Sequence, residues 1–174
     1  MNQLTLYLFI GYPGAGKTSI AKVIAEHTNA FHIWADVERH KLFKNPTHSQ
    51  KESEELYQKL NDATEYLLAH RRSVIFDTTF NHKFDRDKLK AIAKKYHAKV
   101  VLIWVTTPLN IARQRAVNSQ TKRNNYDYHM SLEQFSQLAS KLEPPTEDEP
   151  YVAIDGTNLN EQAILKQLGI KPQK

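Results

Sequence analysis

Residues 11–18 constrain this chain more than any other stretch, because their sequence, GYPGAGKT, has the spacing G-x-x-x-x-G-K-[ST]. An apolar run at 4–10 precedes them and reads as a buried strand. From Ser19 to Glu26 the apolar residues recur on one helical face. A strand, a glycine-rich loop and a helix in this order are typical of a phosphate-binding loop. The alternative, a glycine-rich turn that merely contains Lys-Thr, does not explain the flanking strand and helix.

Each residue type in this loop has a physical role. Gly11, Gly14 and Gly16 allow backbone conformations that a Cβ would penalise, so that successive N–H groups turn inward around an anion. The helix that begins near Lys17 adds unpaired N–H groups and a partial positive charge. We expect Lys17 to reach the β- and γ-phosphates of ATP, and the Thr18 hydroxyl to bind the Mg²⁺ that bridges them. The other residues expected to bind ATP are Pro13, Ala15 and Ser19.

Length and composition indicate an ordinary globular chain. Its 174 residues, 40% hydrophobic and 25% charged, predict one domain over 1–174. The formal net charge of +5 is weak evidence for nucleic acid, because an anion-binding enzyme needs lysines and arginines in any case. The chain has no cysteine, its N-terminal apolar run lacks a cationic leader, and no later segment approaches the length of a membrane span. We therefore expect a cytoplasmic protein with no membrane partner.

Strand-like and helix-like segments alternate along the chain. The expected strands are 4–10, 30–35, 73–77, 100–105 and 151–155, and the main helices are 19–26, 49–70, 85–96, 131–142 and 160–168. This alternation predicts an α/β fold with a five-stranded parallel sheet between helices on both faces, a three-layer sandwich. Ligands bind outside the carboxyl ends of such strands, so residues that follow the strands are expected to converge there.

Two aspartates follow strands and are candidates for the chemistry of phosphoryl transfer. Asp36 is placed to accept a proton from an acceptor hydroxyl, although an aspartate here is also a favoured helix N-cap. Arg39, one helical turn later, is placed to hold an anionic group on the acceptor, and its alternative is a solvated surface arginine. Asp77 ends an apolar strand and is a candidate for holding Mg²⁺ through water or orienting an arginine. Its alternative is a capping aspartate.

A basic segment is expected to form a lid at about 113–130. It contains Arg113, Arg115, Lys122 and Arg123, between two helices, where a cation can neutralise charge on the transferring phosphoryl group. The alternative for any single residue is a solvated charge. The eight histidines are scattered and show no metal-binding spacing, so no metal is expected beyond the Mg²⁺ of the nucleotide.

Four stretches resemble the P-loop kinase family that includes polynucleotide 5′-hydroxyl kinases, zeta-toxin-like ATP-binding proteins of the AAA_33 type and small-metabolite kinases. They are the loop at 11–18, Asp36-x-x-Arg39, the segment VIFDTTFN at 74–81 and the segment LEPPTEDE at 142–149. The resemblance implies a nucleotide-binding fold of the nucleoside-monophosphate-kinase type with a helical, basic lid. It also implies that Asp36 is the general base, that Arg39 contacts an acceptor phosphate and that Arg115 covers the γ-phosphate.

The chain departs from this family at three positions. Thr79 stands where an asparagine often follows Asp-Thr, Arg86 is displaced from the usual arginine, and Ser119 stands where a second lid arginine is expected. Lys122 or Arg123 is the candidate replacement for that arginine.

The sequence thus predicts an ATP- and Mg²⁺-dependent phosphotransferase with Lys17, Asp36, Arg39, Asp77 and Arg115 as catalytic residues. Its acceptor would be a hydroxyl on a nucleic-acid 5′-end or on a small molecule such as a sugar nucleotide. A regulatory ATP-binding module with slow hydrolysis is the non-kinase alternative.

Overall fold

The computed structural model describes residues 3–79, 82–118 and 130–173, and its centre is an all-parallel sheet of five strands in the order β2-β3-β1-β4-β5. The strands are β1 (Thr5–Ile10), β2 (Phe31–Trp34), β3 (Val74–Asp77), β4 (Lys99–Val105) and β5 (Tyr151–Ile154). The predicted α/β fold with a five-stranded parallel sheet is confirmed. The central strand β1 is buried along its whole length, which agrees with its unbroken apolar sequence.

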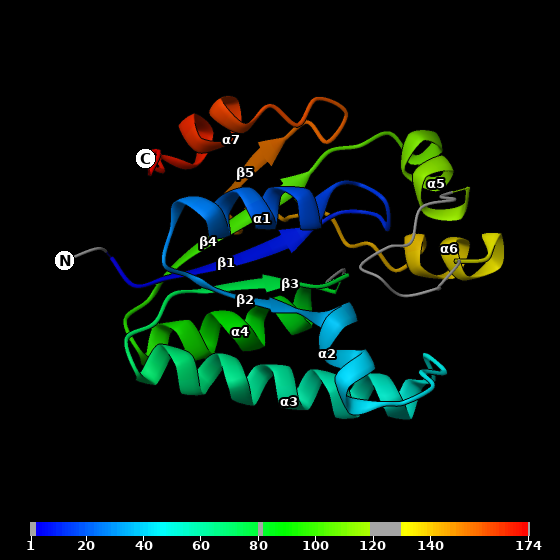
Figure 1. Ribbon diagram of the computed structural model, residues 1–174, viewed down its shortest axis with the longest axis horizontal. Helices are drawn as coiled ribbons and strands as arrows, with labels where there is room; N and C mark the ends of the chain where they lie inside the picture. The colour runs from blue at the N-terminus through cyan, green and yellow to red at the C-terminus, as the bar shows by residue number, and fades with distance from the viewer. Residues whose placement is uncertain (1–2, 80–81, 119–129, 174) are drawn as a thin grey trace.

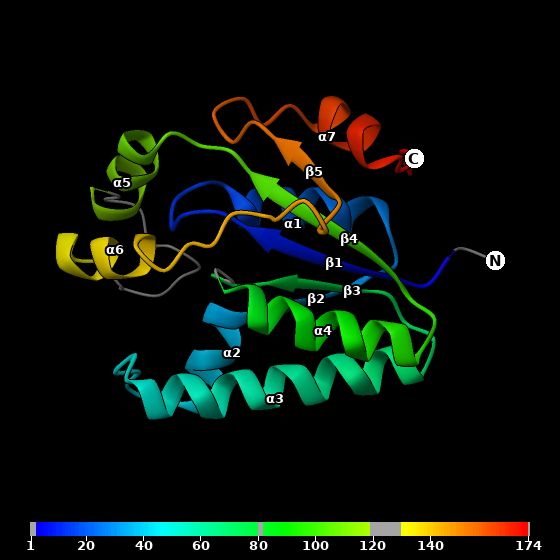
Figure 2. The same ribbon diagram turned by 180° about the vertical axis from the view of Figure 1, so that it is seen from behind.

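Helices cover both faces of this sheet. They are α1 (Lys17–His27), α2 (Ala35–Leu42), α3 (Gln50–Ala69), α4 (Lys83–Lys95), α5 (Leu109–Val117), α6 (Leu132–Ala139) and α7 (Glu161–Leu168). Figure 1 shows α1 and α7 on one face, α3 and α4 on the other, and α5 and α6 beyond the arrowheads of the strands. The view from behind in Figure 2 agrees with this arrangement. The strand ends therefore open toward α5 and α6.

Each face of the sheet has its own apolar core. Because side chains alternate along a strand, Leu6 and Leu8 of β1 pack toward Leu56 and Leu60 of α3, together with α4. Phe9, from the same strand, packs in the other core with α1 and α7. Both cores are fully buried at their centres, so the sheet is a rigid platform for the residues that follow its strands.

Local signals fix several helix ends. The Ser49 hydroxyl accepts from the backbone N–H of Glu52 and caps α3, and the Asn160 side chain caps α7 in the same way. Ser131 and Gln134 form a capping box at the start of α6. These ends lie within a few residues of the predicted ones.

The predicted lid needs a correction in its first part. Arg113 and Arg115 were expected on a basic segment between two helices, but both lie inside α5, which continues to Val117. Ala112 and Ala116 of α5 pack against Phe135 of α6, and this small core stabilises a helix whose own sequence has little apolar period. The rest of the predicted lid, with Ser119, Lys122 and Arg123, lies outside the described residues.

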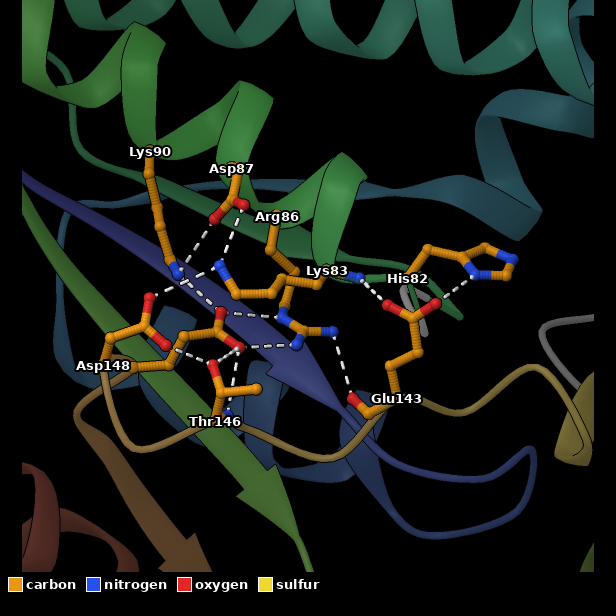
Figure 3. A network of polar contacts seen from close by, with 9 residues as sticks. His82, Lys83, Arg86, Asp87, Lys90, Glu143, Thr146 and Asp148 are labelled. Atoms are coloured by element: carbon orange, nitrogen blue, oxygen red, sulfur yellow. Dashed lines mark hydrogen bonds and ion pairs between the residues drawn. The ribbon is translucent and has the colours of Figure 1, made fainter.

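A buried ion pair links α4 to the segment before β5, and Figure 3 shows the network around it. Arg86 donates from Nε and Nη2 to the two carboxylate oxygens of Glu149, at 3.0 and 2.6 Å, and from Nη1 to the carbonyl of Glu143. Both side chains of the pair have 0% exposure. Lys90 and Thr146 also donate to Glu149. The pair therefore joins α4, the helix that follows the segment at 74–81, to the segment at 142–149.

None of the helices within 3–79, 82–118 and 130–173 combines the length and apolar character that a bilayer span requires.

Candidate functional site

The loop at 11–18 has the geometry of an anion cradle. Gly14 has a φ of +79°, and a Cβ there would lie 2.3 Å from the carbonyl oxygen of Ala112, so that only glycine fits between the loop and α5. The helix α1 begins at Lys17 after Gly16, and no described side chain caps its first turn. The Lys17 ammonium is buried and donates to the carbonyls of Gly11 and Tyr12 at 2.7 and 2.8 Å. The loop therefore offers backbone N–H groups at the start of α1 together with the ammonium group of Lys17, the two features that phosphate binding requires.

Two residues hold this loop in place: one lies in the 106–107 turn, which the sequence places at the strand ends without a role, and the other, Gly156, the sequence marks only as a turn. The buried Thr107 hydroxyl, after β4, donates to the carbonyl of Ala15 at 2.7 Å. A Cβ on Gly156, after β5, would lie 2.1 Å from both the Ala15 carbonyl and the Thr107 hydroxyl. The loop therefore packs directly against the ends of two neighbouring strands. A threonine and a glycine that each follow a strand were the available signals, but neither has a spacing that reveals its partner.

A cavity of about 1220 Å³ opens at the carboxyl ends of the strands. It brings together the candidate residues Lys17, Thr18, Asp36, Arg39, Asp77 and Arg115. Pro13, Gly14, Gly16 and Ser19 of the loop also line it, whereas Ala15 is fully buried beneath. A pocket for one ligand typically measures about 300–1,000 Å³, so this space suits a nucleotide and a second molecule.

Asp36 enters this cavity from the first turn of α2. The helix begins at Ala35, directly after β2, and its N-cap is Trp34. The alternative role of Asp36 as the N-cap is therefore wrong, and its exposed side chain lines the cavity. The helix α2 follows the short β2 directly and runs from the end of the sheet toward α3, as Figure 1 shows.

Arg39 is not a solvated surface arginine. Its guanidinium is buried and donates from Nη1 to Glu52 at 2.6 Å and from Nη2 to the Ser53 hydroxyl at 3.3 Å. Glu52 also accepts from the amide and the hydroxyl of Thr47 and from the amide of His48. The pair therefore ties α2, the 43–49 connection and α3 into one unit beside the cavity.

The two buried glutamates make stability sensitive to acid. Burial raises the pKa of Glu52, but hydrogen bonds from Thr47, Arg39 and His48 outweigh it and lower the pKa from 4.5 to about 2. Burial likewise raises the pKa of Glu149, and hydrogen bonds from Arg86 and Lys90 lower it to about 2. Since both folded-state values lie below the unfolded value, these groups stabilise the protein fully above about pH 4.5 and progressively less as the pH falls toward 2.

We therefore expect the free energy of unfolding, measured by urea titration, to fall between pH 5 and pH 3. The decrease should be smaller in Glu52→Gln, which has lost one of the two titrating groups. A free energy of unfolding in the wild type that does not change over this range would contradict the assignment.

Asp77 ends β3 and is held from β2. Its Oδ2 lies 3.1 Å from Nε2 of His32, and the carboxylate is only 3% exposed. The His32 ring stacks on the Trp34 ring, with 5.6 Å between ring centroids. The helix α4 has His82 as its N-cap, so the alternative role of Asp77 as a helix cap is wrong. His32 is a further residue that sequence reasoning missed, because its contact depends on the pairing of β2 with β3.

Arg115 reaches the cavity from α5. Its Nη1 donates to the carbonyl of Gly156 at 2.7 Å, which brings the guanidinium to the end of β5 beside the loop. Arg113, on the same helix, is exposed and does not line the cavity. Of the two lid arginines that the structure describes, Arg115 is therefore the one near the phosphate-binding loop.

The site fits a magnesium ion that arrives with a nucleotide. Thr18 and Asp77 line the same cavity and offer a hydroxyl and a carboxylate, the oxygen ligands that Mg²⁺ prefers. Within the described part of the chain, no group of three or more histidine, aspartate or glutamate side chains forms a metal cage.

Comparison with known proteins identifies the family of this chain. A family model, AAA_33, described as an AAA domain, matches residues 6–145. Over 143 residues the chain is 30% identical to the 2′,3′-cyclic-nucleotide 3′-phosphodiesterase of Rattus norvegicus. That match covers 80% of this chain and 31% of the rat protein, so the chain spans about a third of its relative's length.

Solved structures with the same fold include kinases. A sugar kinase from Janibacter sp. HTCC2649 matches with a TM-score of 0.69 and 18% identity, over 97% of this chain and 96% of that one. The APS kinase of Mycobacterium tuberculosis, solved with AMPPNP and APS, matches with a TM-score of 0.65 and 16% identity. The match covers 97% of this chain and 99% of the APS kinase. Identities of this size show a shared fold, which is that of P-loop kinases.

Proposed function

This chain belongs to the AAA_33 family of AAA domains and has a P-loop kinase-like fold, and from this premise we propose that it transfers the γ-phosphoryl group of ATP to a hydroxyl acceptor. The observation that carries the proposal is the single cavity lined by the phosphate-binding loop and by Asp36. A donor site alone binds nucleotide. A carboxylate across the same cavity gives the transfer a base.

The proposed reaction balances with the groups that are present. The acceptor oxygen forms a bond to the γ-phosphorus, and the bond from that phosphorus to the β,γ-bridging oxygen breaks. ADP leaves with the electron pair, and the hydroxyl proton passes to the carboxylate of Asp36. In this proposal Lys17 and the loop N–H groups hold the β- and γ-phosphates, and Arg115 balances charge on the transferring group.

In this proposal the remaining residues of the site bind the magnesium ion or position other side chains. Mg²⁺, bound by Thr18 and through water by Asp77, would neutralise charge on the phosphate oxygens. His32 keeps the Asp77 carboxylate in position through the hydrogen bond described above. Arg39 was expected to contact an anionic group on the acceptor. Its pairing with Glu52 instead supports a positioning role, in which it fixes α2, and with it Asp36, against α3.

A label-transfer assay tests the proposal. Purified protein is incubated with Mg²⁺, ATP labelled at the γ-position and a panel of hydroxyl compounds that includes sugars, nucleosides and an oligonucleotide with a 5′-hydroxyl. We expect label in at least one acceptor, with one ADP formed for each label transferred. Slow ADP formation that is independent of every hydroxyl compound would instead support a regulatory ATPase module.

A further inference from the structure

The phosphate-binding loop is packed against the helix that carries Arg115. At Gly14 the backbone of the loop lies so close to the α5 backbone at Ala112 and Ala116 that a Cβ would overlap the Ala112 carbonyl. The other side of α5 is held by α6, where Phe135 packs against the same two alanines. Arg115 therefore belongs to a helix whose backbone is already fixed against the loop.

The guanidinium of Arg115 is held a second time, at the turn after β5. Its Nη1 donates to the carbonyl of Gly156 at 2.7 Å. The Asp155 carboxylate accepts from the amide and the hydroxyl of Thr157, at 2.8 and 2.7 Å, and these bonds fix the turn around Gly156. The arginine is thus held at both ends, its backbone by the packing of α5 and its guanidinium by this turn.

The hydroxyl of Thr107 joins the loop to the same turn. The Thr107 side chain is buried after β4 and donates to the carbonyl of Ala15, itself fully buried, at 2.7 Å. The backbone of Gly156 packs against both groups, since a Cβ there would overlap the Ala15 carbonyl and the Thr107 hydroxyl. The loop, Thr107 and the turn after β5 are therefore in direct contact.

These contacts form a closed ring on the proposed ATP side of the cavity. The loop contacts α5 at Gly14, α5 carries Arg115, and the arginine binds the turn after β5. That turn and Thr107 return to the loop at Ala15. Because the ring is closed, the distance between the loop and the guanidinium depends on every contact in it.

Within this ring the Thr107 hydroxyl acts on the loop alone. Thr107 is buried and does not line the described cavity, so its effect on a bound nucleotide must pass through the loop. An apolar side chain at this position leaves a buried carbonyl without this donor, which is unfavourable. The loop then shifts toward another donor, and the shift changes its distance to Arg115.

We propose that Thr107 is a positioning residue for phosphoryl transfer, whose hydroxyl holds the loop at the distance from Arg115 at which both contact the γ-phosphate of ATP. This inference rests on the proposed phosphotransfer and adds to it a residue outside the cavity. Arg115 is in place on the ATP side before the acceptor binds. Its contact with the γ-phosphate therefore contributes to ATP affinity as well as to turnover.

Affinity for AMPPNP with Mg²⁺, measured by calorimetry without an acceptor, tests the role of the hydroxyl. Thr107→Val keeps the shape of the side chain and removes the hydroxyl, and we expect it to weaken AMPPNP binding about tenfold. Thr107→Ser keeps the donor and should bind within about twofold of the wild type. The matched control is Thr64→Val, because Thr64 is also fully buried and donates to a carbonyl, that of Leu60 at 2.8 Å, but lies on α3. It should leave AMPPNP binding unchanged.

A double-mutant cycle separates the positioning of Arg115 from a general effect on the loop. We expect Arg115→Met to weaken AMPPNP binding less in the Thr107→Val background than in the wild type, because the contact is already impaired there. The same cycle with ADP, which has no γ-phosphate, should show no such coupling. Fold-changes for AMPPNP that simply multiply would overturn the proposal.

The failure of this proposal and the failure of the phosphotransferase are distinguishable, because AMPPNP binding requires no transfer. Wild-type AMPPNP affinity in Thr107→Val, or equal weakening in Thr107→Ser and Thr107→Val, overturns the positioning role and leaves the phosphotransferase intact. Coupling in the cycle without label transfer to any hydroxyl compound overturns the phosphotransferase and leaves the geometry of the ring intact. Thr107→Ala removes the same hydroxyl with a smaller side chain and should weaken binding equally, so the result does not depend on how valine packs.

Discussion

Asp36→Asn is expected to lower phosphotransfer turnover by about 10²- to 10⁴-fold, the usual contribution of a positioned general base. An amide of the same shape cannot take the acceptor proton. The affinity for ATP should stay within about twofold, because the nucleotide is bound by the loop at 11–18, on a different element from α2. Turnover is measured with saturating acceptor, and ATP binding is measured by calorimetry with AMPPNP.

The matched control for this variant is Glu38→Gln. Glu38 lies on the same helix, is bound to the exposed Lys41 at 2.6 Å and does not line the cavity, so turnover should be unchanged. An Asp36→Asn protein that retains full turnover would remove the general base from the proposal. It would favour the regulatory module, in which this carboxylate has no chemical role.

Arg86→Met is expected to destabilise the fold by about 3–5 kcal/mol, because it leaves the buried Glu149 carboxylate without its main partner. For a chain of this size such a loss corresponds to a decrease in Tm of roughly 6–20 °C. The double variant Arg86→Met with Glu149→Leu should recover part of the loss, since no buried charge is then unpaired. Urea and thermal unfolding followed by circular dichroism measure both effects.

Lys95→Gln serves as the control for burial. Lys95 is on the same helix as Arg86 and its ion pair with Glu65 is also 2.6 Å long, but both side chains are exposed. Its loss should leave the stability without measurable change, because water already screens the pair. Equal effects of Lys95→Gln and Arg86→Met would show that burial is not the cause of the expected difference.

The parts of the fold that the sequence predicts are those with local causes. The loop at 11–18 is recognisable because every glycine and the Lys-Thr pair lie within eight residues. The helix α3 is recognisable because its leucines recur at helical spacing and Ser49 caps its start. Asp36 and Asp77 were found because each follows an apolar run, and parallel strands bring such positions to one edge.

The parts that were missed have causes far apart in the chain. The Arg86–Glu149 pair joins residues 63 positions apart, and neither residue has a local pattern that names its partner. The continuation of α5 through Arg115 depends on Phe135 of another helix, which no local period reveals. The buried Arg39 pairs with Glu52 of α3, which also accepts a hydrogen bond from Thr47 in the 43–49 connection, and no local pattern reveals these contacts.

The pair of Arg39 with Glu52 also decides which parts of the site move together. Asp36 is on α2, and this ion pair fastens α2 to α3, a helix that lines the same cavity between Gln50 and Asn61. The proposed base is thus fixed to α3, on the proposed acceptor side of the cavity. Lys17 and Thr18 belong to the phosphate-binding loop and α1, on the proposed ATP side. If the cavity narrows around its substrates, the carboxylate keeps its distance to the acceptor hydroxyl, and the distance that changes is the one to the γ-phosphate.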